Sequence, residues 1–241
     1  MRLVLRFVPL KYYPEGFVNK HTIQGLIYYL LQNSEFSEIH DKPRFKFFTF
    51  SDLYPAGDFY PNKEKTLVIS SPNPYFIRAI EENLREMEYI YLSTLPCKII
   101  SVRIFKPKPS KIFRSGSPLV LLKDKNKGIY FSLRDHGDRK FLLDRVKENA
   151  VKKYNAYYDD ELSLNDEEIF DRWVLKKEVA VQMAMKGKKF LIIGSVWKRL
   201  EKMYIPKHLR RFYNFIMECG IGEKNSLGFG FLNVVGEKHG S

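Results

Sequence analysis

Hydrophobic and polar residues recur with regular periods along the first half of the chain. Residues 2–8 (Arg-Leu-Val-Leu-Arg-Phe-Val) are typical of a strand, and apolar residues between 23 and 31 recur at i, i+3, i+4, i+7 and i+8, as on one face of a helix. The pattern then predicts two strands, a helix opened by a proline, and a last strand, at 45–50, 65–70, 75–87 and 97–105. This order, βαββαβ, is that of a ferredoxin-like domain.

The second half repeats the same plan less clearly. Its predicted elements are strands at 118–123 and 128–133 around a hairpin signal, a helix at 140–154, strands at 169–184 and 188–199, a helix at 206–218 and a strand at 229–235. Residues 106–118 hold three prolines, a glycine and three serines, which is typical of a connector. We therefore predict an α+β protein of two tandem ferredoxin-like (RRM-like) domains, 1–105 and 119–241, joined by a linker at 106–118.

The composition indicates that the protein binds a negatively charged partner. Hydrophobic residues make up 44% of the 241 residues, enough for a packed core, and 41 Lys and Arg against 28 Asp and Glu give a net charge of +13. Residues 1–97 carry 11 basic and 11 acidic side chains, whereas 98–153 carry 16 and 5, so the excess lies in the second half. This distribution favours contact with nucleic acid, and a lysine-rich solubilising surface or a basic membrane-surface helix remain alternatives.

Other classes of protein find little support in the sequence. Cys97 and Cys219 are far apart and outside any C-x-x-C pair, which argues against a disulfide framework and a zinc site and favours a reducing compartment. Apolar runs are too short for a secretory signal or a membrane span, so we expect a soluble, cytoplasmic protein without a membrane partner. The sequence has no H-E-x-x-H motif and no clustered Cys/His set. We therefore expect the protein to use neither a metal nor a cofactor.

The most distinctive local feature is the segment GIGEKNSLGFG at 220–230, with four glycines between a predicted helix and a predicted strand. It follows the C-terminus of a helix, the negative end of the dipole, whereas phosphate-binding loops present a helix N-terminus. It also lacks the G-K-[ST] order of a P-loop. We therefore expect a loop whose glycines permit positive φ and close backbone approach, with Lys224, Asn225 and Ser226 as exposed donors.

This segment and the closing strand FLNVVG resemble the glycine-rich signature of the RAMP superfamily, specifically its CRISPR repeat-RNA-processing endoribonucleases. The resemblance extends to the N-terminal strand, to QGLIY at 24–28 and to FTFS at 48–51, while residues 105–200 match only in general organisation. That family has two tandem ferredoxin-like domains. The resemblance thus agrees with the order of elements predicted from periodicity.

The resemblance implies metal-independent cleavage of CRISPR repeat RNA in precursor transcripts, which releases guide RNAs. The RNA's own 2′-hydroxyl would attack the adjacent phosphorus and leave a 2′,3′-cyclic phosphate and a 5′-hydroxyl. The family's Tyr, His and Lys match Tyr28, His40 and Lys46. His40 would serve as general base or acid, Lys46 would stabilise the charged transition state, and Tyr28, expected to face outward from its helix, would position the scissile phosphate or share the proton transfer.

Taken singly, these three residues have plainer interpretations: an amphipathic surface tyrosine, a solvated loop histidine and the exposed position of a strand. Repeat RNA, single-stranded or weakly structured, is expected to contact Gly220, Gly222, Lys224, Asn225, Ser226, Gly228, Gly230, Lys186, Lys188, Lys189, Lys198, Arg199 and Arg210. A family member that binds repeats without cutting them and an unrelated RRM-like module stay open as alternatives. Other CRISPR effector-complex proteins are further candidate partners, and a monomer and a homodimer both fit the sequence.

Overall fold

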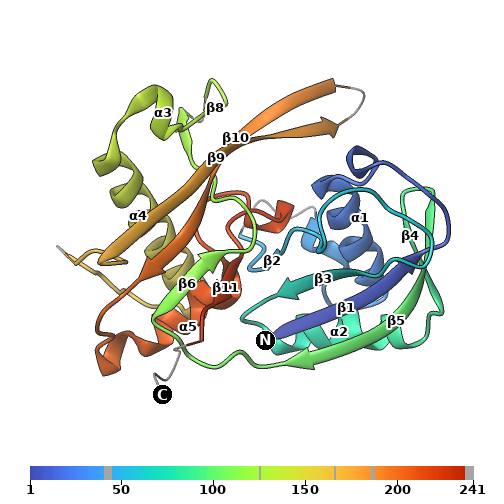
Figure 1. Cartoon of the computed structure of the whole chain (residues 1–241). Coiled ribbons are helices and arrows are strands. Elements are labelled where there is room, and N and C mark those ends of the chain that lie inside the picture. The colour runs from blue at the N-terminus through green and yellow to red at the C-terminus, as the bar shows by residue number, and fades with distance from the viewer. Residues whose placement is uncertain (41–44, 125, 166, 186–187, 237–241) are drawn as a thin grey trace, which may run out of the picture.

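The computed structural model describes residues 1–40, 45–124, 126–165, 167–185 and 188–236. Its strands form two main antiparallel sheets, one in each half of the chain, which lie next to each other with helices packed on them (Figure 1). Each half has its own hydrophobic core, one built around α1 and α2 and the other around α4 and α5. The chain is therefore organised as two packed units.

The N-terminal half carries a five-stranded sheet in the order β2-β3-β1-β5-β4. Its elements are β1 (Arg2–Pro9), α1 (Lys20–Leu30), a 3-10 turn η2 (Ser37–His40), β2 (Thr49–Phe50), β3 (Lys65–Ser70), α2 (Pro74–Arg85), β4 (Tyr89–Leu92) and β5 (Leu95–Phe105). The helices begin at asparagine caps, because the Asn19 and Asn73 side chains accept hydrogen bonds from backbone N–H groups of the first turn. The edge strand β4 is an addition that periodicity did not predict.

The C-terminal half carries a four-stranded sheet in the order β11-β6-β10-β9. Its elements are β6 (Ile112–Ser115), β7 (Leu122–Asp124), β8 (Ile129–Tyr130), α3 (Leu133–His136), α4 (Arg139–Tyr158), β9 (Arg172–Met185), β10 (Lys188–Glu201), α5 (Arg210–Cys219), a 3-10 turn η4 (Asn225–Leu227) and β11 (Leu232–Val234). Strands β7 and β8 form a separate hairpin outside the main sheet. Strands β9 and β10 pair along nearly their whole length and extend beyond the sheet (Figure 1).

The two sheets have the same topology. In chain order, β1-α1-β2-β3-α2-β5 and β6-α4-β9-β10-α5-β11 are both βαββαβ, and in both sheets the first strand lies between the third and the fourth. The predicted α+β fold with tandem ferredoxin-like units is thus confirmed. A strand assignment within it was wrong, because the second unit starts with β6, inside the segment expected to be a linker, and not at 118–123.

The misassigned strand has a physical explanation. Strand β6 has four residues, too few to show a period, and the prolines and serines around it are typical of a connector. What defines it as a strand is pairing with β10 and β11, in which Phe113 lies opposite Leu200 and is fully buried. The strand expected at 45–50 is likewise shortened to β2, since Phe47 has a φ of 51° and interrupts the extended backbone.

Polar contacts join the two halves. Arg2 of β1 donates from Nη2 to the carbonyl oxygens of Met217 (2.8 Å) and Leu232 (2.6 Å), and the N-terminal amine pairs with Glu218. Arg2 is 4% exposed, and its desolvation lowers the pKa of the guanidinium to about 10. Because burial of an unpaired charge is costly, these contacts favour one relative placement of the halves.

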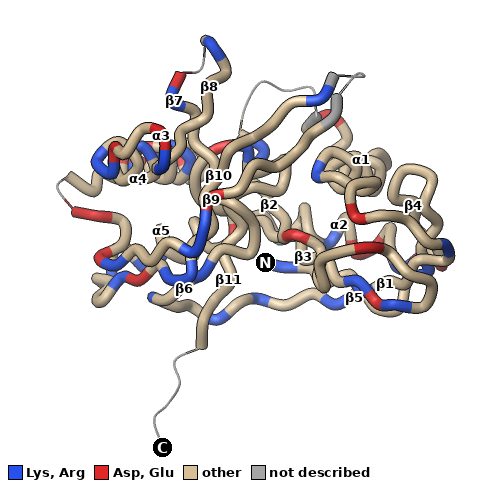
Figure 2. Tube along the Cα trace, turned by 45° about the horizontal axis from the view of Figure 1, so that its top comes forward, with Lys and Arg blue, Asp and Glu red and all other residues tan. Residues whose placement is uncertain are grey.

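The basic side chains follow the uneven distribution seen in the sequence. Lys and Arg are frequent along the connector from β5 to β6 and in the α3–α4 region (Figure 2). Among the described residues, no helix is both long and apolar enough to cross a membrane. Cys97 and Cys219 are both buried and free.

Candidate active site between the two halves

The glycine-rich loop (residues 220–230) packs against β2 of the N-terminal half. Thr49 Oγ1 donates to the carbonyl oxygen of Phe229 at 3.0 Å, and a Cβ on Gly228 would lie 2.1 Å from a ring carbon of Phe50. A Cβ on Gly230 would lie 1.8 Å from the carbonyl oxygen of Ile221. Both glycines have φ values in the left-handed region, +81° and +69°. The two motifs that carried the resemblance, FTFS and the glycine-rich segment, therefore meet in space.

Asn225 corrects one expectation about this loop. Its side chain is 9% exposed and cannot be an exposed donor: Nδ2 donates to the carbonyl oxygens of Ile221 and Phe229, both at 3.0 Å. Its Oδ1 accepts from Nζ of Lys153 at 2.6 Å. The side chain thus organises the loop from inside, whereas its neighbours Lys224 and Ser226 are half-buried.

Tyr28 lies where α1 meets the loop. It is half-buried and does not face outward as predicted: its ring packs edge-on against Phe48 with centroids 6.1 Å apart, and its hydroxyl is hydrogen-bonded to the Ser226 side chain. Gln24, one helical turn earlier, donates from Nε2 to the Ser226 carbonyl oxygen (2.8 Å) and makes a longer contact with the Tyr28 hydroxyl (3.4 Å). Burial raises the pKa of Tyr28, although these hydrogen bonds oppose the shift.

Lys46 reaches the same region from the segment before β2. Its Nζ donates to the carbonyl oxygen of Ile39, the residue before His40. The backbone of His40 ends η2, so the chain brings it next to the Lys46 contact, but the His40 side chain lies outside the described part of the structure. Tyr28 and Lys46 are thus gathered at one edge of the loop.

A pocket of about 380 Å³, here called the loop pocket, lies between Lys46 and the loop. It is lined by Phe45, Lys46, Phe47, Phe48, Leu122, Arg145, Glu148, Asn149, Lys152, Lys153, Cys219, Gly222, Glu223, Lys224, Asn225 and Ser226. Five of these are basic and two are acidic, and both acids pair with Arg145, Glu223 at 2.7 Å and Glu148 at 2.9 Å. The remaining positive charge suits a phosphate.

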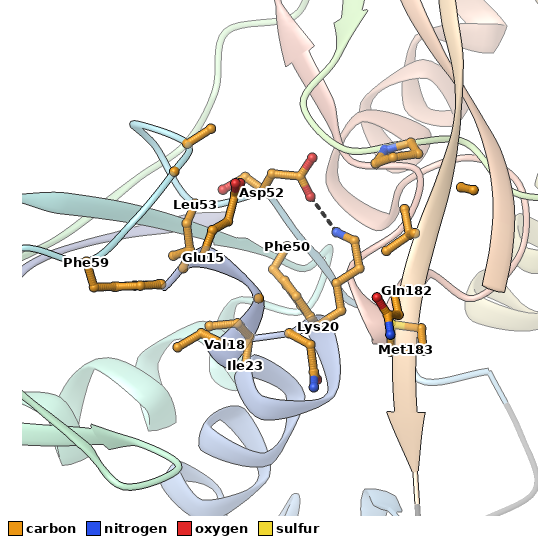
Figure 3. Close-up of a pocket in the computed structure, with 18 of the residues that line it drawn as sticks. Glu15, Val18, Lys20, Ile23, Phe50, Asp52, Leu53, Phe59, Gln182 and Met183 are labelled. Carbon is orange, nitrogen blue, oxygen red and sulfur yellow. Dashed lines mark hydrogen bonds and ion pairs between the residues drawn. The ribbon is translucent and has the colours of Figure 1, made fainter. Parts of the chain in front are cut away.

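A second and larger pocket, here called the cleft pocket, opens between α1 and β9 and measures about 830 Å³. Figure 3 shows Lys20 of α1 and Asp52 pointing toward one another, joined at 2.5 Å, with Gln182 and Met183 of β9 opposite. Its charged lining is balanced: Lys20 and Lys189 against Asp52 and Glu15. This balance makes it a weaker phosphate site than the loop pocket.

The predicted basic contacts do not gather at one point. Lys189 lines the cleft pocket, while Arg199 lies ten residues along β10, about 33 Å away on an extended strand, and is paired with Glu201 at 2.7 Å. Lys198 and Arg210 are exposed elsewhere on the C-terminal half. Lys186 lies outside the described residues, as does the side chain of Lys188. A bound RNA would have to be extended to contact all of them.

Three basic residues of α4 at the loop pocket escaped sequence reasoning: Arg145, Lys152 and Lys153. For Lys153 a signal existed, because it continues the buried stripe of α4, Leu142, Val146 and Ala150, where an apolar residue is expected. Among the residues that the structure describes, no group of three or more His, Cys, Asp or Glu is placed to hold a metal ion.

Comparison with known proteins gives several matches. The family model described as CRISPR associated protein Cas6, C-terminal, matches residues 101–234. The CRISPR-associated endoribonuclease Cas6 2 of Methanocaldococcus jannaschii is 45% identical over 241 residues, covering 98% of this chain and all of that protein. The CRISPR-associated endoribonuclease Cas6 of Haloferax mediterranei is 21% identical, covering 89% of this chain and 86% of its own length. A solved structure named CRISPR associated protein Cas6 has a TM-score of 0.71 at 24% identity, covering 98% and 99% of the two chains.

Proposed function

The chain belongs to the Cas6 family of CRISPR-associated proteins, and from that premise we propose that it is an endoribonuclease that cleaves CRISPR repeat RNA in precursor transcripts. The products are guide RNAs. The relatives named as endoribonucleases support the reaction class, and the near-complete coverage of the M. jannaschii protein supports the same activity for the whole chain.

The observation that carries this proposal is that Lys46 and the glycine-rich loop line a pocket with excess positive charge, and that the Tyr28 hydroxyl is hydrogen-bonded to Ser226 of that lining. An RNA phosphate in the loop pocket would lie beside the Lys46 ammonium and near the Tyr28 hydroxyl. The side chains come from the N-terminal half and the loop from the C-terminal half. A purely RNA-binding module does not require a half-buried tyrosine hydroxyl beside such a pocket.

In the proposed mechanism the 2′-hydroxyl of the RNA loses its proton to His40 and attacks the adjacent phosphorus. Lys46 stabilises the negative charge that develops on the phosphorane oxygens. Tyr28 is assigned as the acid that protonates the departing 5′-oxygen, because a phenol is protonated at neutral pH and this hydroxyl is hydrogen-bonded to Ser226, which lines the loop pocket. The role of His40 rests on the resemblance. The RNA then carries a 2′,3′-cyclic phosphate on one fragment and a 5′-hydroxyl on the other.

The basic side chains and the loop are proposed to hold the repeat. Lys224 and Ser226 line the loop pocket, and Lys189, Lys198 and Arg210 offer further positive charge along the C-terminal half. Positive charge of this kind binds the RNA backbone with little sequence preference.

The test uses labelled repeat RNA from the genome that encodes this chain, incubated with the protein in EDTA. A parallel RNA carries hydrogen in place of the 2′-hydroxyl at the cleavage position. We expect cleavage of the first RNA, a cyclic phosphate on its 5′ fragment, and binding without cleavage of the second. Tight binding with both RNAs intact would contradict the enzyme and favour a non-cleaving RNA-binding protein, and cleavage of the deoxy RNA would contradict the mechanism.

A further inference from the structure

Lys153 is a buried amine that the proposed chemistry does not use. It lies on α4, is 3% exposed, and its Nζ donates to three oxygens of the glycine-rich loop. The acceptors are the carbonyl oxygens of Gly220 (2.8 Å) and Gly222 (3.2 Å) and Oδ1 of Asn225 (2.6 Å). An ammonium has three donors, so each of them is used.

The position of this lysine is unusual for a merely structural contact. Burial of an ammonium is costly, and none of its three acceptors is a carboxylate. An apolar residue would complete the stripe of Leu142, Val146 and Ala150 without that cost. Burial accordingly lowers the pKa of Lys153. What the lysine adds is a definite arrangement of the loop backbone around Asn225.

From Asn225 the contacts lead to Tyr28. The next residue, Ser226, is held from the other half by Gln24, whose Nε2 donates to its carbonyl oxygen at 2.8 Å. The Ser226 side chain is hydrogen-bonded to the Tyr28 hydroxyl. Lys20, one turn before Gln24 on α1, donates to the carbonyl oxygen of Gly228 at 2.7 Å and supports the far end of the loop.

We propose that Lys153 and Gln24 are positioning residues for RNA cleavage: from opposite halves they hold Asn225 and Ser226 so that Ser226 orients the Tyr28 hydroxyl at the loop pocket. This inference rests on the proposed function. It predicts that loss of either residue slows the chemical step without weakening RNA binding, because all three donors of Lys153 are used on the loop and Lys46, Lys152 and Lys224 keep the pocket positive.

The test measures two quantities, the single-turnover cleavage rate at saturating repeat RNA and the Kd for the 2′-deoxy RNA that cannot be cleaved. Lys153→Met keeps the apolar stem and removes the three donors. We expect its cleavage rate to fall roughly 10- to 100-fold, since a misplacement of about 1 Å costs up to about 100-fold, while the Kd stays at the wild-type value. The matched control is Lys147→Met on the same helix, where Nζ donates at 2.9 Å to the carbonyl oxygen of Asn165, away from the pocket; it should change neither quantity.

Circular dichroism and thermal unfolding establish that each variant is folded. If Lys153→Met does not fold, Gln24→Leu tests the proposal instead. Gln24 is half-buried, so its replacement leaves the buried residues of α1 in place. Thr22→Val on the same helix is the matched control. A folded Lys153→Met or Gln24→Leu variant that cleaves at the wild-type rate overturns the proposal. The proposal is also overturned if a variant cleaves slowly at low RNA concentration but reaches the wild-type rate at saturating RNA, because the defect then lies in binding. Failure of the wild-type protein to cleave contradicts the proposed function instead.

Discussion

The two halves share one topology and differ in what they bring to the interface between them. The N-terminal half is neutral by count and offers side chains, Tyr28 on α1 and Lys46 before β2. The C-terminal half has the excess of positive charge and offers a backbone, the glycine-rich loop, with its buried support from α4. Duplication of a fold has therefore not duplicated a site. The candidate site requires both halves in contact, and each prediction below changes one half and uses a matched change as its control.

The largest expected effect comes from the side chains of the N-terminal half that we propose to be catalytic. Tyr28→Phe removes the hydroxyl and leaves the ring against Phe48, so we expect cleavage to fall by about 100-fold or more at an unchanged Kd. Lys46→Met should slow cleavage roughly 100- to 1,000-fold, because it removes the charge proposed to stabilise the transition state. Single-turnover kinetics measure both. Tyr29→Phe is the matched control, since that neighbour is 57% exposed; an equal loss there would mean that the assay reports general damage to α1.

The loop of the C-terminal half should be intolerant of a single methyl group. Gly230→Ala combines a φ of +69° with a contact at 1.8 Å, and we expect a loss of about 3 kcal/mol or more in the free energy of unfolding. Gly25→Ala on α1 has open space around the new methyl and should stabilise by about 0.5–1 kcal/mol. Urea denaturation measures both values. A Gly230→Ala protein as stable as the wild type would show that the loop is not packed as described.

The asymmetry of charge predicts an asymmetry in salt dependence. Lys198→Gln with Arg210→Gln in the C-terminal half should lower the slope of log Kd against log salt by about 1 for each RNA phosphate that is no longer neutralised. The matched pair, Lys63→Gln with Arg78→Gln, removes two exposed charges from the N-terminal half and should leave the slope unchanged. Filter binding with the uncleavable RNA across salt concentrations measures the slopes. Equal slopes for the two double variants would contradict the division of charge between the halves.

The smallest expected effect is on the stability of the protein at alkaline pH, through an aromatic contact between the halves. The Tyr157 ring centroid lies 5.0 Å from that of Phe47 and 5.5 Å from that of Phe215. Burial raises the pKa of Tyr157 to about 12. Because an unfolded tyrosine releases its proton near pH 10, at a lower pH than the folded one, stability should fall as the pH rises from about 10 to 12. Tyr157→Phe should reduce that fall in urea denaturation at about pH 9 and pH 11. Tyr91→Phe, on the exposed edge strand β4, should not.

Periodicity predicted what depends on neighbours in sequence. The stripe from Ile23 to Leu31 did form α1, and the order of elements in both halves indicated the tandem fold. Strand β6 was missed because four residues carry no period, and its pairing partner Leu200 lies more than eighty positions away. Tyr28 was predicted to face outward for a related reason. The helical period defines only the face toward the core, whereas the Tyr28 ring packs on Phe48 and its hydroxyl meets Ser226 of the second unit.

By itself, the sequence determined the class of fold, the half that holds the positive charge and the motifs that name a family. The glycines of residues 220–230 predicted close approach of the backbone to other atoms. Only the tertiary structure decided which atoms these are: the ring of Phe50 in the other half and carbonyl oxygens of the loop itself. It also decided that Asn225 points inward to Lys153, and that Tyr28 meets Ser226 almost two hundred residues away. Such contacts depend on distances between segments far apart in the chain, which local composition and spacing do not record.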